Sequence, residues 1–353
     1  MEVGVGVGVA LGDSLALAET LGLSVTIAVG SPDGVQAART TRTPITPAAV
    51  ARVRAVDRGD ARMGFKLPLR VDSPPEYGGA MASTAQEASA IAVAQFAPGE
   101  DSDANFEQMA RLAGDAANRG ALLVVFPEYS SYFTPELGAD WHAHSQPLHG
   151  PFVRALAELA TELGIHLVAG MVERVPDEDT RVANTLIAVS DTGDLLAHYR
   201  KMHLYDAFGQ RESDWVLPGE ITEPEIFEVG GIRVGLQTCY DVRFPEVTRR
   251  LVDAGAELVL LPSEWVRGPL KEQHWRTLVT ARAIENTVYV AAADQAPPVG
   301  AGNSMIVDPM GVELVTIGET PGVAVAWISA HRVAEVRIVN PALGLRRFGV
   351  HPS

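Results

Sequence analysis

Residues 232–246 read Ile-Arg-Val-Gly-Leu-Gln-Thr-Cys-Tyr-Asp-Val-Arg-Phe-Pro-Glu and place the single cysteine of the chain after an apolar segment. The apolar residues within 232–238 predict a short buried strand that ends at Cys239. Pro245 fits the first turn of a helix, because its missing N–H has no partner there in any case. The stretch therefore predicts a strand, a turn that carries a thiol, and a helix, as in α/β proteins.

Two further apolar segments end on a polar residue in the same way. The strand predicted over 122–126 is followed by Glu128, and the strand predicted over 195–200 is followed by Lys201. Polar groups at the carboxyl ends of strands converge on one edge of a sheet, where α/β folds place their ligand crevice. We therefore expect Glu128, Lys201 and Cys239 to meet in one site.

These three residue types together make a workable nucleophilic set. A thiol with a pKa of about 8.5 is mostly protonated at neutral pH, so it needs a nearby base or a positive neighbour. Glu128 can take the thiol proton and later pass it to a leaving nitrogen. Lys201 can place its charge opposite an oxyanion, with the backbone N–H of Tyr240 as a second donor. Taken singly, the residues also fit plainer roles: a buried apolar cysteine, a strand-end acid and a surface lysine.

The rest of the chain from Ala90 onward alternates apolar strand-like runs with amphipathic helical stretches. Helices are predicted from Asp103 to Gly120, from Pro151 to Gly164, and after Pro245 and Pro269. Strands are predicted over 91–96, 122–126, 166–174, 184–190, 195–200, 232–238, 257–261, 287–293, 303–307, 312–317 and 322–328. Because strands outnumber helices, two sheets between helix layers fit better than a doubly wound sheet with one helix per strand.

The charge balance is acidic, since 28 Lys and Arg stand against 44 Asp and Glu, for a formal net charge of −16. An acidic chain without a dense basic run repels phosphate, which argues against nucleic acid or an anionic membrane as the main partner. Apolar residues make up 47% of the 353 residues, enough for a well-formed core. A single cysteine excludes an internal disulfide framework and a CxxC zinc site, so a reducing, cytoplasmic setting is the default expectation.

Residues 1–80 differ from the remainder of the chain. They carry as many acidic as basic groups and only two aromatic residues, so they offer little from which to build a core. They show neither a basic n-region nor an uncharged apolar run of about 18 residues, which speaks against a signal peptide and a membrane span. We expect an N-terminal extension over 1–80, outside a catalytic domain over 81–353. The same contrast suggests the hypothesis that translation starts at Met81.

The three strand-end segments resemble the signatures of the nitrilase, or carbon–nitrogen hydrolase, superfamily. Glu128 lies in Phe-Pro-Glu, Lys201 in Tyr-Arg-Lys-Met-His-Leu-Tyr-Asp and Cys239 in Cys-Tyr-Asp-Val-Arg-Phe-Pro-Glu. Three downstream blocks also match: Trp275, Ala-Arg-Ala-Ile-Glu-Asn at 281–286, and Gly-Asn-Ser-Met-Ile-Val-Asp-Pro-Met-Gly at 302–311. All three motifs occur in the order of the family with their neighbours intact, so the resemblance is specific.

The resemblance covers roughly residues 88–330 and implies a four-layer αββα sandwich with Glu128, Lys201 and Cys239 as the catalytic triad. The family also uses a second glutamate that positions the lysine, and Glu212, in Gln-Arg-Glu-Ser, is its counterpart here. The mechanism so implied needs no metal and no organic cofactor. Family members commonly associate, so a homodimer or larger homo-oligomer is expected.

The cysteine segment is similar to the amidase branch that includes ω-amidase and the deaminated-glutathione amidases. The resemblance implies an amide substrate, and it implies that Arg243 meets a substrate carboxylate through a bidentate pair. Glu264 departs from the small residue that is usual after Pro-Ser, and its charge would repel an anionic substrate unless Arg243 or Arg267 neutralises it. We expect hydrolysis of a small carboxylate-bearing amide through a thioester on Cys239, with release of ammonia or an amine.

Other functions stay open at this point. An N-carbamoyl or nitrile hydrolase would use the same scaffold, and a catalytically silent binding subunit would keep the fold without turnover. A metal hydrolase would need ligands, and His142, His144 and His149 form the one metal-like cluster in the sequence. The Trp, Ser, Gln, Pro and Gly residues around these histidines predict a loop, so no metal is expected there.

Overall fold

Two β-sheets form the centre of the fold. The computed structural model describes residues 88–352, and the first of these sheets contains the first strand of that range. The extension predicted over 1–80, and the boundary at 81, lie outside these residues. In spatial order the sheet comprises β13 (Gly322–Ile328), β1 (Ser89–Gln95), β2 (Leu123–Val125), β3 (His166–Glu173), β4 (Val182–Val189) and β5 (Leu195–Arg200), with β6 (Val216–Leu217) paired to β4. β1, β2 and β3 are parallel to one another, whereas β13 is antiparallel to β1, and β4 is antiparallel to β3 and β5. The short β6 is parallel to β4.

The second sheet repeats this mixed design. In spatial order it comprises β12 (Glu313–Thr316), β11 (Met305–Val307), β10 (Tyr289–Asp294), β9 (Leu258–Ser263), β8 (Ile232–Leu236) and β7 (Ile226–Val229). Its three central strands, β8 to β10, run parallel. Their residues are almost continuously apolar because both faces of a parallel sheet are covered.

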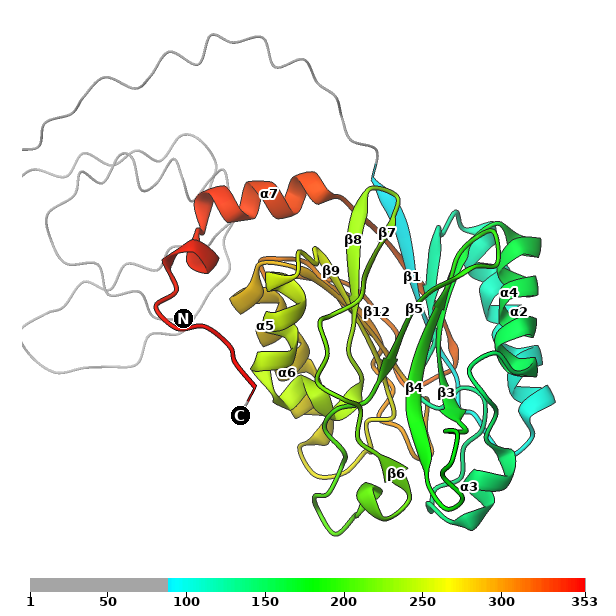
Figure 1. The fold of residues 1–353 in the computed structure, drawn as a ribbon. Coiled ribbons are helices and arrows are strands. Elements are labelled where there is room, and N and C mark those ends of the chain that lie inside the picture. The colour runs from blue at the N-terminus through cyan, green and yellow to red at the C-terminus, as the bar shows by residue number, and fades with distance from the viewer. Residues whose placement is uncertain (1–87, 353) are drawn as a thin grey trace, which may run out of the picture. The chain divides into compact units, whose positions relative to one another are not determined.

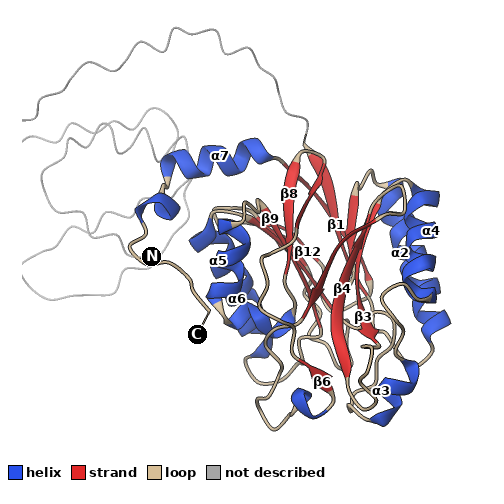
Figure 2. Cartoon of the chain, viewed as in Figure 1, coloured by secondary structure: helices blue, strands red, loops and turns tan. Residues whose placement is uncertain are grey.

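Helices cover the outer face of each sheet, so that the layers are helix, sheet, sheet, helix (Figures 1 and 2). The outer helices are α2 (Ser102–Asn118) and α4 (Pro151–Leu163) on the first sheet, and α5 (Pro245–Asp253) and α6 (Lys271–Asn286) on the second. The remaining helical segments are α3 (Ala139–His144), α7 (Ala330–Val339), and the short 3₁₀ helices η1 (Glu212–Asp214), η2 (Cys239–Arg243) and η3 (Ala342–Leu345). The predicted αββα sandwich is confirmed.

Three apolar clusters hold the layers together. Buried side chains such as Ile91, Val125, Leu258 and Ile306 fill the space between the two sheets. A second cluster joins the first sheet to α2 and α4, and a third joins the second sheet to α5 and α6. At roughly 1.5–3 kcal/mol for each large side chain removed from water, these clusters supply the main driving force for folding.

The local signals in the sequence locate most elements to within one or two residues. Pro151 begins α4, and Gly164 ends it in the left-handed conformation. The helix predicted from Asp103 begins one residue earlier, because Asp101 is its capping residue and accepts hydrogen bonds from the backbone N–H groups of Asp103 and Ala104. β6, β7 and α7 were not predicted from the sequence, and α3, which contains His142 and His144, forms where a loop was predicted.

Within the described residues, the structure has no helix that is both long and apolar enough to cross a lipid bilayer.

Candidate active site

Cys239 lies at the junction between β8 and α5, as the first residue of η2. Its φ angle is +45°, a left-handed backbone conformation that is unfavourable for any residue except glycine. The residue is only 6% exposed, and Sγ lies 3.4 Å from the carbonyl oxygen of Glu264, to which the thiol donates a hydrogen bond. A strained backbone of this kind is often found at functional sites, because the surrounding structure must enforce it.

Asp241 holds the turn that carries the cysteine. Its buried carboxylate accepts hydrogen bonds from the Tyr199 hydroxyl at 2.6 Å and from the backbone N–H of Thr238 at 3.2 Å. The same carboxylate lies 2.8 Å from Nδ1 of His203, whose ring stacks on Phe244. These contacts join the turn to β5 and to the residues that follow it, among them Lys201, and so fix the nucleophile relative to the lysine.

Glu128 follows β2 and is 1% exposed. Its Oε1 accepts hydrogen bonds from Lys201 Nζ at 3.0 Å and from Asn184 Nδ2 at 2.5 Å. Its Oε2 accepts a hydrogen bond from the backbone N–H of Glu264 at 2.6 Å. Asn184 was missed by the sequence analysis, although an amide within the otherwise apolar β4 is a signal, since buried polar groups need a partner.

Gly170 in β3 allows the backbone of Glu128 to lie where it does. A Cβ atom on Gly170 would lie 2.5 Å from the backbone nitrogen of Tyr129 and 2.7 Å from the Cα of Glu128. Only a residue without a side chain permits such a close approach. The glycine therefore contributes to the position of the carboxylate, although it makes no contact with the cavity itself.

Lys201 and Glu212 complete a buried ionic cluster. Lys201 Nζ lies 2.9 Å from Glu212 Oε2, and both side chains are almost fully buried. Glu212 also accepts hydrogen bonds from the Tyr129 hydroxyl at 2.6 Å and from the backbone N–H of Tyr205. The prediction that Glu212 lies beside the lysine therefore agrees with the geometry, whereas Tyr129 was not anticipated.

Burial and charge set the protonation of this cluster. Burial opposes the positive charge of Lys201, but the carboxylates of Glu128 and Glu212 outweigh it and raise the pKa of the ammonium group well above its ordinary value. Burial also opposes the charge of Glu212, yet the nearby Lys201 and the hydrogen bond from Tyr129 lower the pKa of that carboxyl. Lys201 is therefore a cation and Glu212 an anion at neutral pH.

The pKa of the Cys239 thiol is raised, whereas the pKa of an activated cysteine is lowered. Burial raises the pKa of this thiol well above its ordinary value, and the charge of Glu128 adds to the rise, while Lys201 opposes it. The sulfur is thus protonated at rest. A reaction at this sulfur needs a base, and the Glu128 carboxylate is buried beside the same cavity.

A cavity of about 110 Å³ brings the predicted residues together. Six of the seven candidate residues line it: Glu128, Lys201, Glu212, Cys239, Tyr240 and Glu264. Arg243, the seventh, is not among the lining residues. Its guanidinium carbon lies 4.8 Å from the ring centre of Trp265, and its Nη2 lies 3.4 Å from His274 Nδ1.

Glu264 lines the cavity with a carboxyl group whose Oε1 is buried without a hydrogen-bond partner in the described chain. Burial and, next, the charge of Glu128 raise the pKa of the Glu264 carboxyl well above its ordinary value. Arg267, which the sequence analysis considered as its neutralising partner, instead pairs with Glu272 and Glu319. A raised pKa, and not an arginine, therefore limits the negative charge at Glu264.

Lys271 is a lining residue that the sequence analysis missed. Its Nζ donates a hydrogen bond to the Tyr205 hydroxyl at 2.6 Å and lies over the rings of Phe208 and Trp265. Nothing in the local sequence marks this lysine, because its place in the cavity depends on Tyr205 and Phe208, which lie more than 60 residues earlier in the chain.

Two of the three histidines of the predicted metal-like cluster, His142 and His144, make other contacts. His142 Nε2 lies 3.2 Å from the carbonyl oxygen of Glu178, and the ring of His144 stacks on Tyr132. Both belong to α3, where residues two apart do not share a face. Across residues 88–352, no group of three or more His, Cys, Asp or Glu side chains could hold a metal ion.

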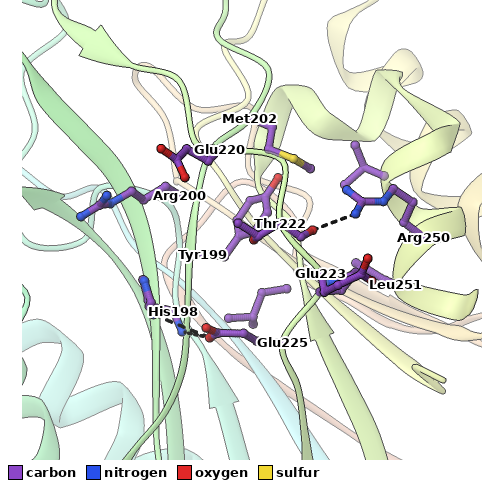
Figure 3. A pocket seen from close by; sticks show the side chains of 13 residues that line it. His198, Tyr199, Arg200, Met202, Glu220, Thr222, Glu223, Glu225, Arg250 and Leu251 are labelled. Carbon is purple, nitrogen blue, oxygen red and sulfur yellow. Dashed lines mark hydrogen bonds and ion pairs between the residues drawn. The ribbon is translucent and has the colours of Figure 1, made fainter. Parts of the chain in front are cut away.

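A second, larger cavity of about 430 Å³ lies between β5, α5 and the segment before β7 (Figure 3). Its walls include Tyr199, Met202 and Arg250, and Arg250 donates a hydrogen bond to the carbonyl oxygen of Thr222. None of the seven candidate residues lines this cavity. The smaller cavity, which holds the thiol, is therefore the candidate active site.

Comparison with known proteins shows the family of the chain. Residues 90–338 match the carbon–nitrogen hydrolase family. A hydrolase of Mycobacterium tuberculosis is 41% identical over 263 residues, which cover 70% of this chain and 91% of that protein. The deaminated glutathione amidase of Escherichia coli O157:H7 is 39% identical over 265 residues, which cover 73% of this chain and 97% of that protein.

A solved structure is also similar. A mutant of the amidase from Nesterenkonia sp. AN1 is 26% identical with a TM-score of 0.62, and the match covers 74% of this chain and 98% of that one. That structure shows covalent addition of the acetamide moiety of fluoroacetamide at its active site cysteine.

The fold is an αββα sandwich, and its cavity is lined by a cysteine, a glutamate and a lysine that each follow a strand. This combination is typical of hydrolases of the nitrilase type. The chain belongs to the carbon–nitrogen hydrolase family. It is an amidase of the nitrilase superfamily, so the predicted family and enzyme class are confirmed.

Proposed function

We propose that the protein hydrolyses the carbon–nitrogen bond of a small, carboxylate-bearing linear amide through a thioester on Cys239. The single observation that carries this proposal is the enclosure of a thiol, a carboxylate and an ammonium group around one cavity. Each of the three is buried, and each is fixed by contacts with other elements of the fold. Because the three side chains are buried, their charges interact more strongly than they would in bulk water.

In the first half-reaction, Glu128 takes the proton of Cys239 as the sulfur attacks the amide carbon. A base is required because burial keeps the thiol protonated at neutral pH. A carbon–sulfur bond forms and a tetrahedral oxyanion develops. When the carbon–nitrogen bond breaks, Glu128 passes its proton to the nitrogen, and ammonia or an amine leaves.

Lys201 and the backbone N–H of Tyr240 stabilise the oxyanion. Lys201 is protonated at neutral pH, because, despite its burial, the neighbouring carboxylates raise its pKa. Its Nζ donates hydrogen bonds to Glu212 at 2.9 and 3.1 Å, which hold it in place. Tyr240 is the second residue of η2, where the first backbone N–H groups have no acceptor within the helix. Two such donors at a developing oxyanion are worth several kcal/mol in oxyanion sites of this type, on the order of 3 kcal/mol for each.

In the second half-reaction, a water molecule replaces the departed nitrogen group. Glu128 takes a proton from this water, which attacks the thioester carbon, and the carbon–sulfur bond breaks with return of the proton to sulfur. A carboxylic acid leaves and the enzyme is regenerated. The protons balance: Cys239 supplies the proton that leaves on the nitrogen, and the water supplies the proton that returns to sulfur.

Two cations near the cavity support the proposal that the substrate carries a carboxylate. Lys271 lines the cavity, and Arg243 lies against the same aromatic side chains, Phe208 and Trp265. Burial and, next, the charge of Glu128 raise the pKa of the Glu264 carboxyl, which reduces its negative charge and so its repulsion of an anion. An amide that carries a carboxylate would therefore find favourable charge in an otherwise acidic protein.

Ammonia release from a panel of carboxylated, neutral and cationic amides tests the proposal. We expect turnover of carboxylated amides, loss of turnover in Cys239→Ala and Cys239→Ser with unchanged circular dichroism, and an initial burst of ammonia as the thioester accumulates. Fluoroacetamide should add to Cys239 in the wild-type protein, as detected by intact mass. Full activity of either cysteine variant would refute the mechanism, and absence of both labelling and turnover would favour a silent binding subunit.

Product analysis separates the alternatives on the same scaffold. An N-carbamoyl hydrolase would release CO₂ together with ammonia, and a nitrile hydrolase would form ammonia from a substrate without an amide. A homodimer or larger assembly and a cytoplasmic location stay predictions, which light scattering of the purified protein and fractionation of cells would test.

A further inference from the structure

Lys271 presents an ammonium group at the wall of the cavity that contains Cys239. It is the first residue of α6, and its Nζ donates a hydrogen bond to the Tyr205 hydroxyl at 2.6 Å. The same nitrogen lies 4.1 Å from the ring centre of Phe208 and 5.5 Å from that of Trp265. Aromatic faces attract a cation, so these three neighbours restrict the position of a side chain that is otherwise very flexible.

The charge of Lys271 is not neutralised within residues 88–352, where it forms no salt bridge with a carboxylate. Its closest contacts are a hydroxyl group and aromatic rings, which carry no net charge. A second cation, Arg243, lies against Phe208 and Trp265 as well. Burial and, next, the charge of Arg243 lower the pKa of Lys271, so the two cations repel each other in the absence of an anion.

The backbone before Lys271 supports a functional placement. Leu270, at the N-cap of α6, has a φ angle of +62°, although its side chain is 63% exposed and makes no contribution to the core. Phe208, the ring nearest to the ammonium group, also has a positive φ angle, of +55°. A left-handed conformation costs a non-glycine residue roughly 1 kcal/mol, and such strain tends to be kept where it places a functional group.

Arg243 occupies a different position relative to the cavity. It lies against Phe208 and Trp265, is not among the residues that line the cavity, and approaches His274 through Nη2. Lys271 therefore has access to a bound molecule that Arg243 lacks, even though Arg243 belongs to the cysteine motif.

We propose that Lys271 binds the carboxylate of the amide substrate and sets the preference of the enzyme for anionic amides, with Arg243 supporting the aromatic wall behind it. This inference rests on the proposed amidase function of the same cavity. The ammonium group gains a charged partner when the substrate binds, and the repulsion between the two cations is relieved. Hydrogen bonds between charged groups are worth about 1.5–3 kcal/mol, which corresponds to roughly a 10- to 100-fold preference.

The test compares two pairs of substrates of matched shape. Succinamate is paired with 4-methylpentanamide and glutaramate with 5-methylhexanamide, because an isopropyl group has the branching of a carboxylate without its charge. The measured quantity is the ratio of kcat/KM for the anionic amide to kcat/KM for its neutral counterpart. We expect this ratio to fall at least about tenfold in Lys271→Met and in Lys271→Gln, mainly through KM for the anionic amide, and to recover substantially in Lys271→Arg.

Arg267→Met is the matched control, because Arg267 is a cation of the same loop region whose partners are Glu272 and Glu319 at the surface. Its ratio should stay at the wild-type value. A ratio in both Lys271 variants within about twofold of wild type would overturn the role of Lys271 while leaving the amidase proposal intact. An equal fall of the ratio in Arg267→Met would also overturn the role of Lys271, because the loss of any positive charge in this region would then explain the change in preference. If the wild-type protein releases ammonia from none of these or other amides, the amidase proposal itself fails, and the inference fails with it.

Discussion

The backbone N–H of Glu264 donates a hydrogen bond of 2.6 Å to Oε2 of Glu128. The carbonyl oxygen of the same residue accepts the hydrogen bond from the Cys239 thiol. One peptide segment after β9 thus contacts both the base and the nucleophile of the proposed reaction. Because these contacts use the backbone, substitution of the Glu264 side chain leaves them in place and isolates the effect of its carboxyl group.

Glu264 should make substrate binding dependent on pH. Its carboxyl is protonated below its raised pKa and becomes an anion as the pH rises through that value, which places a negative charge beside an anionic substrate. We expect KM for succinamate to increase with pH by about fivefold, the effect of roughly 1 kcal/mol of repulsion between like charges in a partly hydrated site. In Glu264→Gln this increase should be absent. Steady-state kinetics between pH 6 and about pH 9 would measure it, and an equal increase in the variant would contradict the assignment.

Removal of the buried ammonium group should destabilise the protein strongly. Lys201→Met leaves the carboxylates of Glu128 and Glu212 buried without their shared cation. Loss of one partner from a buried ion pair costs about 3–5 kcal/mol, so the free energy of unfolding in urea should fall by about that amount. Arg111→Met breaks an exposed pair on α2 and should change it by less than about 1 kcal/mol. Similar losses in the two variants would contradict a special role for burial.

Gly170→Ala should lower turnover without any change in a side chain that lines the cavity. The added Cβ would meet the backbone of Glu128 and Tyr129 at 2.5–2.9 Å, so the carboxylate must shift. A displacement of about 1 Å at a catalytic group can cost on the order of 100-fold, and we expect kcat to fall between about 10- and 100-fold. Gly114→Ala is the control, because Gly114 lies in α2 with open space around it and alanine there should stabilise the helix. If Gly170→Ala keeps the kcat of the wild type, β3 moves to accommodate the added Cβ without displacing Glu128, and the prediction is wrong.

Asp294 should make stability dependent on pH. It is fully buried, its Oδ1 accepts a hydrogen bond from the backbone N–H of Trp265, and its Oδ2 has no partner among the described residues. Burial raises the pKa of this carboxyl well above its ordinary value, so the folded protein keeps a proton that the unfolded chain loses. The resulting stability is complete below the unfolded pKa of about 4 and is lost as the pH rises toward the folded pKa, at up to about 1.4 kcal/mol per pH unit.

Asp294→Asn removes this titration while keeping the shape of the side chain. The free energy of unfolding of the variant should therefore decrease less than that of the wild type between about pH 5 and pH 8. Urea unfolding at both values would measure the difference. Asp115→Asn, at an exposed position of α2, should follow the wild type. A variant whose pH dependence equals that of the wild type would show that Asp294 is not the titrating group.

Local signals in the sequence predicted most of the helices and strands, and they predicted the polar residues that follow three of the strands. Alternating apolar runs, Pro151 and Gly164 marked the strands and helices, because hydrophobic period and helix ends depend on neighbouring residues only. The short strands β6 and β7 were missed, since two to four residues carry too little pattern to distinguish them from a loop.

The sequence by itself determined which residue types could carry the chemistry: one cysteine, and an acid and a lysine that each follow an apolar strand. Only the tertiary structure decided their surroundings. Asn184, Gly170 and Lys271 come from separate elements, and their relation to the cavity depends on how two sheets and their loops pack. Burial and the sum of nearby charges also decided the protonation of the thiol and of Glu264, because a pKa responds to every group around it and not to its neighbours along the chain.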